Sequence, residues 1–148
     1  MKKVYLATSI STRVDGDGRV HLHYKEHIEA ILKALKAGNL DVFCAVEEQG
    51  WKISTDYTPG QAVTYDLSEI KASDYVLAVL HEDASWGVQY EMGYGAGIGK
   101  TVVIATEPAD KLAYFNSGLV ESKAIKHIVY KNAADLAHQF AKISDSME

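Results

Sequence analysis

The residues best suited to chemistry lie in one short segment, residues 85–91, which combines a hydroxyl, a glycine and a carboxylate. Ser85 stands at the expected start of a helix, where its side chain can cap the helix and the free N–H groups of the first turn can bind an anion. Glu91 follows Gly87 by four residues, so both face the same side of that helix. Because Gly87 has no side chain, a substrate can approach the Glu91 carboxylate. The segment therefore predicts a small site that binds an anion beside a reactive carboxylate.

Short apolar runs that alternate with helical patterns must position this segment. We expect strands at residues 4–7, 41–46, 75–80, 101–105 and 125–130. We expect helices at residues 21–37, 58–72, 86–99, 112–120 and 133–143. The second helix has the start signals of a capping box, Thr58 and Gln61, with Pro59 at its first position. The alternation predicts one α/β domain over residues 1–148, a doubly wound five-stranded parallel sheet in the flavodoxin-like order.

The expected sheet also predicts where a ligand binds. In an open parallel sheet the crevice lies beyond the carboxyl ends of the strands, here near the switch point between the first and third strands. This rule selects three loops: residues 8–11, which include Ser9 and Ser11; the residues after Val46; and residues 81–87.

Composition excludes several classes of function. Lys and Arg number 15 and Asp and Glu 20, so the formal net charge is −5, and no basic cluster is available to neutralise the phosphates of a nucleic-acid polymer. The single Cys44 cannot form an internal disulfide, which favours a reducing compartment, and no apolar run approaches the roughly 20 residues of a membrane helix. We therefore expect a soluble cytoplasmic protein with no nucleic-acid polymer and no membrane as partner.

Two weaker signals are better explained by structure. The glycines at residues 93–99 are spaced by two and lie within a helix, so we interpret them as helix–sheet packing instead of a dinucleotide-binding loop. His21 and His23 have no third ligand at a fitting spacing. We therefore predict no metal and no cofactor.

The segment around Glu91 resembles the signature of the nucleoside 2-deoxyribosyltransferase superfamily. It reads SWGVQYEMGYGA over residues 85–96 and GKTVVI over residues 99–104, with Thr101 where the family has proline. Two further segments resemble the family: Asp66-Leu67 with Ile70, Ala72 and Asp74, and Val4-Tyr5-Leu6-Ala7 with Ser9. The resemblance covers about residues 3 to 120, and it implies the same α/β fold.

The resemblance implies a role for each matched residue. Glu91 corresponds to the carboxylate that attacks or stabilises the sugar when an N-glycosidic bond breaks. Asp66 is the second carboxylate, which donates a proton or holds the sugar and base, and a like charge at Glu91 could help to keep it protonated. Tyr5 is expected to donate its hydroxyl to Glu91. Relatives complete their sites across a homodimer contact with an Asn or Ser, here Asn116 and Ser117.

Within the superfamily, the chain looks most like the nucleoside 5′-monophosphate N-glycosidases, including the cytidylate hydrolases. Transferases that act on free nucleosides tend to have Asp at the position of Ser85, and a carboxylate there would repel a phosphate dianion. We therefore predict that Ser9, Ser11 and Ser85, with the room left by Gly87, bind the phosphate of a small nucleotide. Where such relatives place an arginine, this chain has Ser11, with Arg13 two residues later.

Three other functions are compatible with parts of the pattern. One is a nucleoside 2-deoxyribosyltransferase that exchanges bases on free deoxynucleosides, and another is a nucleotide-binding sensor without turnover. A receiver-type signalling domain fits poorly, because Thr8-Ser9 and His81-Glu82 stand where acidic residues are needed. No residue distinguishes a hydrolase from a transferase or identifies the base.

Overall fold

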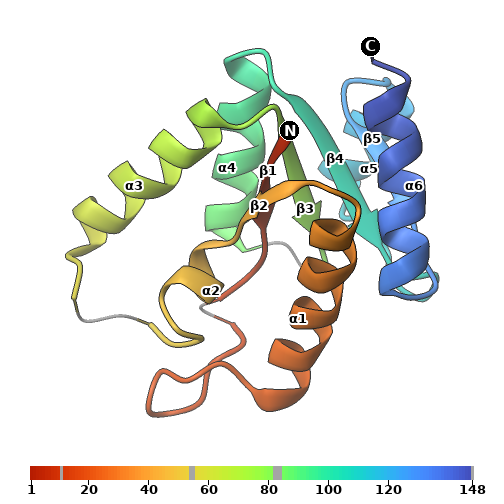
Figure 1. The fold of residues 1–148 in the computed structure, drawn as a ribbon. Helices are drawn as coiled ribbons and strands as arrows, with labels where there is room; N and C mark the ends of the chain where they lie inside the picture. Colours follow the sequence, from red (N-terminus) through yellow and green to blue (C-terminus); the bar gives the residue numbers. More distant parts are fainter. Residues whose placement is uncertain (11, 54–55, 82–84, 148) are drawn as a thin grey trace.

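The computed structural model describes residues 1–10, 12–53, 56–81 and 85–147, which form one five-stranded parallel sheet flanked by helices (Figure 1). The strands are β1 (Lys3–Ala7), β2 (Asp41–Phe43), β3 (Tyr75–Val79), β4 (Thr101–Thr106) and β5 (Lys126–Val129). The helices are α1 (Leu22–Ala37), α2 (Ala45–Glu48), α3 (Pro59–Ala72), α4 (Trp86–Gly97), α5 (Tyr114–Glu121) and α6 (Ala133–Asp145). The sheet order is β2-β1-β3-β4-β5, all parallel, so the predicted flavodoxin-like α/β fold is confirmed.

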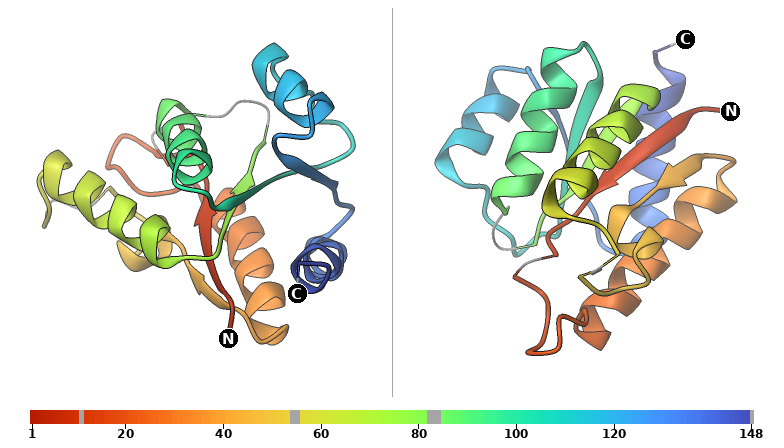
Figure 2. Two further views of the ribbon diagram at one scale, coloured as in Figure 1. Left: turned by 90° about the horizontal axis from the view of Figure 1, so that it is seen from above. Right: turned by 90° about the vertical axis from the view of Figure 1, so that its left-hand side faces the viewer.

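The helices cover both faces of the sheet, with α1 and α6 on one side and α3, α4 and α5 on the other (Figure 2). Successive strand residues point to opposite faces. In β3, Leu77 packs with the α1 and α6 residues, whereas Val76 and Ala78 pack with Ile70 of α3 and Met92 of α4. All five β3 residues are buried, as the predicted central strand requires.

The structure contains the local features on which two predictions are based, the capping box of α3 and the close packing of the α4 glycines. Thr58 caps α3 through its hydroxyl, which accepts a hydrogen bond from the Gln61 N–H, and the Gln61 side chain accepts one from the Thr58 N–H. In α4, a side chain at Gly95 would place its Cβ 2.7 Å from Val76 Cγ2. The packing interpretation of the glycines is therefore confirmed at Gly95, where the helix lies close to the sheet.

The predicted strand at residues 41–46 is too long. Strand β2 ends at Phe43, and residues 45–48 form the short helix α2, in which the Glu48 N–H donates to the Cys44 carbonyl. Val46 is buried in either conformation, so an apolar run at this place is equally compatible with a strand and with a helical turn. The correction moves Glu47 and Glu48 from a loop into α2.

Candidate active site

A pocket of about 270 Å³ opens between α3 and α4 on the face of the sheet that these helices cover. Its lining residues are Val63, Asp66, Leu67, Gly87, Tyr90 and Glu91. Three come from α3 and three from α4, at the same helical spacing of i, i+3 and i+4. The structure thus brings the predicted Asp66, Gly87 and Glu91 to one cavity, and it adds three apolar or aromatic residues that the sequence analysis missed. The helical spacing from Asp66 and Glu91 is the signal that could have found them.

Tyr5 lies beneath this pocket and contacts the Glu91 carboxylate. It projects from β1 toward α3 and α4, and its buried hydroxyl donates a hydrogen bond to Glu91 Oε1 at 2.9 Å. On its other side the Tyr5 ring stacks on Phe43 of β2, with the ring centroids 5.6 Å apart. The expected hydrogen bond is therefore present, and it fixes one oxygen of the carboxylate.

The surroundings of the Glu91 carboxyl raise its pKa toward neutrality. Burial raises its pKa to about 7; the hydrogen bond from Tyr5 opposes this change, and the charge of Asp66 adds to it. Burial and the negative charge of Glu91 also raise the pKa of Tyr5, so its phenol stays a hydrogen-bond donor.

Asp66 is also perturbed, but not mainly for the expected reason. Its pKa is raised to about 6, first by burial and then by the charge of Glu69 one helical turn away on α3. The sequence analysis attributed such a shift to Glu91. Burial is thus the main cause that raises the pKa of both carboxyls of this pocket.

The amino end of α4 is joined to the loop after β1 by two serines. Ser85 is the N-cap of α4, and its hydroxyl accepts a hydrogen bond from the Val88 N–H at 3.3 Å. The backbone N–H of Ser85 donates to the hydroxyl oxygen of the buried Ser9 at 3.2 Å. Ser9 and Ser85 thus lie together at a helix N-terminus, and Ser11 is outside the described residues.

Arg13 lies at the same carboxyl edge of the sheet, where the sequence analysis gave it no firm role. Its Nη2 donates to the His81 carbonyl at 2.7 Å, and its guanidinium lies 5.3 Å from the centre of the Tyr24 ring. Its Nε is buried and has no hydrogen-bond partner within the described residues. A buried guanidinium N–H with no acceptor is a natural partner for an anion.

Asn116 and Ser117 do not line the pocket between α3 and α4. Asn116 is buried within its own chain, and its Oδ1 finds no partner among the residues that the structure describes. Ser117 is exposed on α5 beside Phe115. Of this predicted pair, only Ser117 is accessible to a second molecule.

Metal-binding geometry occurs away from the histidines considered above. In the described part of the chain, His81, Glu107 and Asp110 form the one group of three potential ligands whose donor atoms lie within 4.8 Å of one another. His21 and His23 do not belong to it.

The sequence profile that describes nucleoside 2-deoxyribosyltransferases matches residues 4–139, nearly the whole chain. The chain belongs to the nucleoside 2-deoxyribosyltransferase family. Membership makes it an enzyme that acts on nucleosides or nucleotides, as a glycosidase or a transferase. A sequence search of curated proteins gave no match.

Solved structures of similar fold include both kinds of enzyme. The CMP N-glycosidase BcmB of Clostridium botulinum is 20% identical over 96% of this chain and 99% of its own, with a TM-score of 0.67. A 2-deoxyribosyltransferase from the psychrotolerant bacterium Bacillus psychrosaccharolyticus is 18% identical over 91% of this chain and 90% of its own, with a TM-score of 0.66. BlsM is 19% identical over 99% of this chain and 93% of its own, with a TM-score of 0.75. At such identities the likeness establishes the fold.

In the part of this chain that the structure describes, no helix is both long enough and apolar enough to cross a membrane.

Proposed function

We propose that this enzyme hydrolyses the N-glycosidic bond of a nucleoside or deoxynucleoside 5′-monophosphate, releasing the free base and a sugar phosphate. The observation that carries the proposal is the hydrogen bond between Tyr5 and Glu91 at the floor of a pocket that Asp66 also lines. It is supported by the two serines at the N-terminus of α4 and by the fold shared with a CMP N-glycosidase.

Glu91 is the nucleophile. Tyr5 holds Oε1, so Oε2 is the oxygen aimed at the anomeric carbon. As the new C–O bond forms, the C–N bond breaks and its electron pair leaves with the base, which takes a proton from solvent. Water then attacks the anomeric carbon of the glycosyl ester and loses a proton to solvent, which restores the Glu91 carboxylate and yields the sugar phosphate.

Asp66 holds the substrate in the reactive form of the site. Glu91 must be ionised to attack, and its pKa of about 7 exceeds the value of about 6 at Asp66. Above about pH 7 both carboxyls are ionised in the proposed reactive form. A carboxylate accepts hydrogen bonds, so Asp66 binds a hydroxyl of the sugar or an N–H of the base.

The phosphate binds at the N-terminus of α4. The first-turn N–H groups and the positive end of the helix dipole favour an anion there. The hydroxyls of Ser9 and Ser85 complete this site, and the Arg13 guanidinium, which donates to the His81 carbonyl, adds positive charge at the same edge. Ser11 is assigned to the same role from its position in the sequence.

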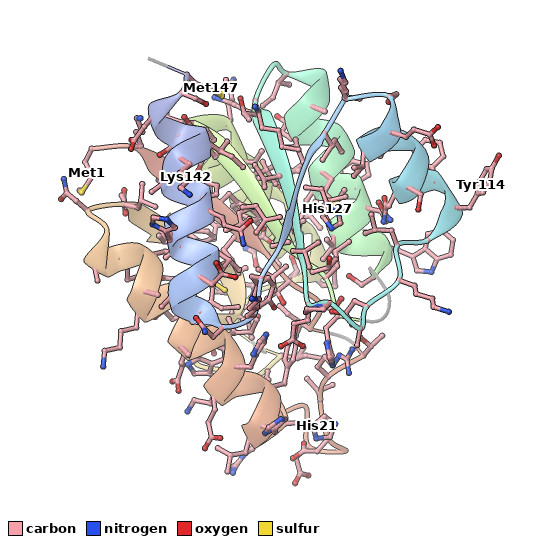
Figure 3. All side chains as sticks on the ribbon, turned by 90° about the vertical axis from the view of Figure 1, so that its right-hand side faces the viewer. Met1, His21, Tyr114, His127, Lys142 and Met147 are labelled. Atoms are coloured by element: carbon pink, nitrogen blue, oxygen red, sulfur yellow. The ribbon has the colours of Figure 1, made fainter. Side chains whose placement is uncertain are left out.

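A homodimer completes the site. Four aromatic side chains are exposed on α4 and α5, where Trp86 is 93% and Tyr114 96% exposed; the others are Tyr90 and Phe115. Figure 3 shows Tyr114 projecting outward from its helix. Aromatic residues are enriched at protein interfaces, so we expect a second copy of the chain to bury these side chains. Ser117 of each chain would then contribute to the site of the other.

The assay that tests the proposal measures free base released from nucleosides and their 5′-monophosphates, in both ribo and deoxy forms. Release from a 5′-monophosphate without an added base supports the hydrolase. Release that needs a second base, with free deoxynucleosides preferred, would instead identify a base-exchanging transferase.

Ser85→Asp adds a carboxylate at the proposed phosphate site and should weaken 5′-monophosphate affinity by at least about tenfold, while unchanged affinity would contradict the phosphate assignment.

A further inference from the structure

A second cluster of reactive side chains lies outside the pocket between α3 and α4. His81 follows the end of β3, and Glu107 and Asp110 follow the end of β4. We propose that these three residues bind a first-row transition-metal dication such as Zn²⁺. None of its three residues lines the Glu91 pocket, and the site meets the proposed phosphate site at the hydrogen bond from Arg13 to the His81 carbonyl.

The spacing of the donor atoms fits a metal better than a direct hydrogen bond. His81 Nδ1 lies 3.4 Å from Asp110 Oδ1 and 3.6 Å from Glu107 Oε2. Ligands bound at about 2.1 Å from a tetrahedral zinc ion lie about 3.4 Å apart. The two distances from His81 match two edges of such a tetrahedron, and the donor atoms of Glu107 and Asp110 lie within 4.8 Å of each other. Hydrogen bonds from a ring N–H to an oxygen are typically shorter, at about 2.7–3.2 Å.

The ligand positions are fixed by their own backbone contacts. Asp110 Oδ2 accepts a hydrogen bond from the Glu107 N–H at 2.9 Å, and Asp110 Oδ1 lies 3.4 Å from His81 Nδ1. The Asp110 N–H in turn donates to the Glu107 carbonyl at 3.1 Å. The His81 carbonyl accepts a hydrogen bond from Arg13. Such supporting contacts hold ligands in place before a metal arrives.

A buried acceptor beside Asp110 independently indicates a missing donor. Asn116 is 1% exposed, its Oδ1 has no partner within the described residues, and it lines a cavity of about 10 Å³ together with Asp110 and Thr106. That volume is about the space that one water molecule needs. A water in this cavity would donate to the Asn116 oxygen and lie beside Asp110, one of the three proposed ligands.

The electrostatic surroundings favour a cation. After burial, the charges of Glu107 and Asp110 are the next causes of the raised pKa of Tyr130. One imidazole nitrogen and two carboxylate oxygens suit Zn²⁺ or Co²⁺ better than Mg²⁺ or Ca²⁺, which prefer oxygen ligands alone.

Titration of the full-length, chelator-treated protein with Zn²⁺ and Co²⁺ tests the site. We expect one ion per chain, visible absorption typical of tetrahedral Co²⁺, and a higher melting temperature, because the ion binds the folded state. His81→Ala should lower Zn²⁺ affinity more than about tenfold, and so should Asp110→Asn, whose amide oxygen can keep the hydrogen bond from Glu107. The side chain of His81 is 38% exposed, so His81→Ala is tolerated by the fold, and the melting of each metal-free variant checks this.

The double variant His21→Ala/His23→Ala is the matched control, because both residues are exposed and lie outside the cluster. It should keep the affinity of the original protein for Zn²⁺. Absence of stoichiometric binding would overturn the proposal, as would affinity that survives His81→Ala or is lost in the control. Equal binding of Mg²⁺ would also overturn it, because the imidazole would then not be a ligand.

Discussion

At the scale of single residues, the reactivity of the site depends on one carboxyl group and the phenol that contacts it. Burial favours the neutral form of Glu91, and the hydrogen bond from Tyr5 favours the charged form. The outcome is a pKa of about 7, close enough to neutrality that the proposed nucleophile is partly ionised there. Two predictions follow from this balance.

The first concerns the pH dependence of the unmodified enzyme. Below pH 7 Glu91 carries a proton and cannot attack, and above pH 7 it is ionised. Since both carboxyls are ionised in the proposed reactive form, kcat/KM should rise through about pH 7 to a plateau. The measurement is kcat/KM for base release between pH 5 and 9, a range of about two units on either side of that value. A bell-shaped profile that falls above pH 7 would instead make Asp66 a proton donor.

The second concerns Tyr5→Phe, which removes the hydroxyl and keeps the ring that stacks on Phe43. Without the hydrogen bond that lowers it, the pKa of Glu91 should rise by about half a unit to one unit. The acidic limb of the pH profile would move up by the same amount, and kcat/KM at pH 7 would fall several-fold. A limb that stays in place would show that the hydroxyl does not act through the ionisation of Glu91.

At the scale of elements, α4 must lie close to the sheet so that Glu91 reaches Tyr5. Gly95 makes this approach possible, because a Cβ there would lie 2.7 Å from Val76 Cγ2. Gly95→Ala should therefore lower the free energy of unfolding by about 1–3 kcal/mol. Gly93 lies on the same helix with nothing within 4 Å of an added Cβ, so Gly93→Ala should stabilise by up to about 1 kcal/mol. Urea denaturation of both variants measures the difference, and equal effects would contradict the packing account.

The elements that could be predicted from the sequence carry local signals. The unbroken apolar run of β3, the Ser85 cap of α4 and the capping box of Thr58 and Gln61 each act within a few residues. The helix α2 could not be predicted in this way, because Val46 continues the apolar run of β2 and is buried in either conformation.

The site could likewise be predicted only where its residues are close together in the sequence. Helical spacing alone places Gly87 and Glu91 on one side of α4. Asp66 lies on another helix, so its approach to Glu91 depends on how α3 packs against α4, and only the family resemblance indicated it. The pKa of Asp66 is raised by its burial and by the charge of Glu69. The burial depends on how the two helices pack, and Glu69 is not one of the residues that carry the family resemblance.

At the scale of the whole molecule, an acidic protein can still bind a nucleotide. The formal net charge of −5 opposes a polynucleotide, but under the proposed function a single phosphate needs only the local N–H groups and hydroxyls at the end of α4. Two of the 20 acidic residues, Asp66 and Glu91, line the proposed site, where burial raises the pKa of both.

The exposed aromatic residues predict the state of assembly. Phe115 is 73% exposed beside the fully exposed Tyr114, and a second copy would bury both. Size-exclusion chromatography with light scattering should give the mass of two chains, and Phe115→Glu should give one chain, because an unpaired charge would enter the interface. A strict monomer for the unmodified protein at assay concentration would contradict the dimer.

The most direct test of the account is base release by Glu91→Gln, measured with substrate affinity in the same preparation. Glutamine keeps the size of the side chain and can still accept a hydrogen bond from Tyr5, but it cannot act as a carboxylate nucleophile. The account predicts that turnover falls by at least about a thousandfold while substrate affinity changes only a few-fold. Substantial residual turnover in this variant would contradict the assignment of Glu91 as the nucleophile.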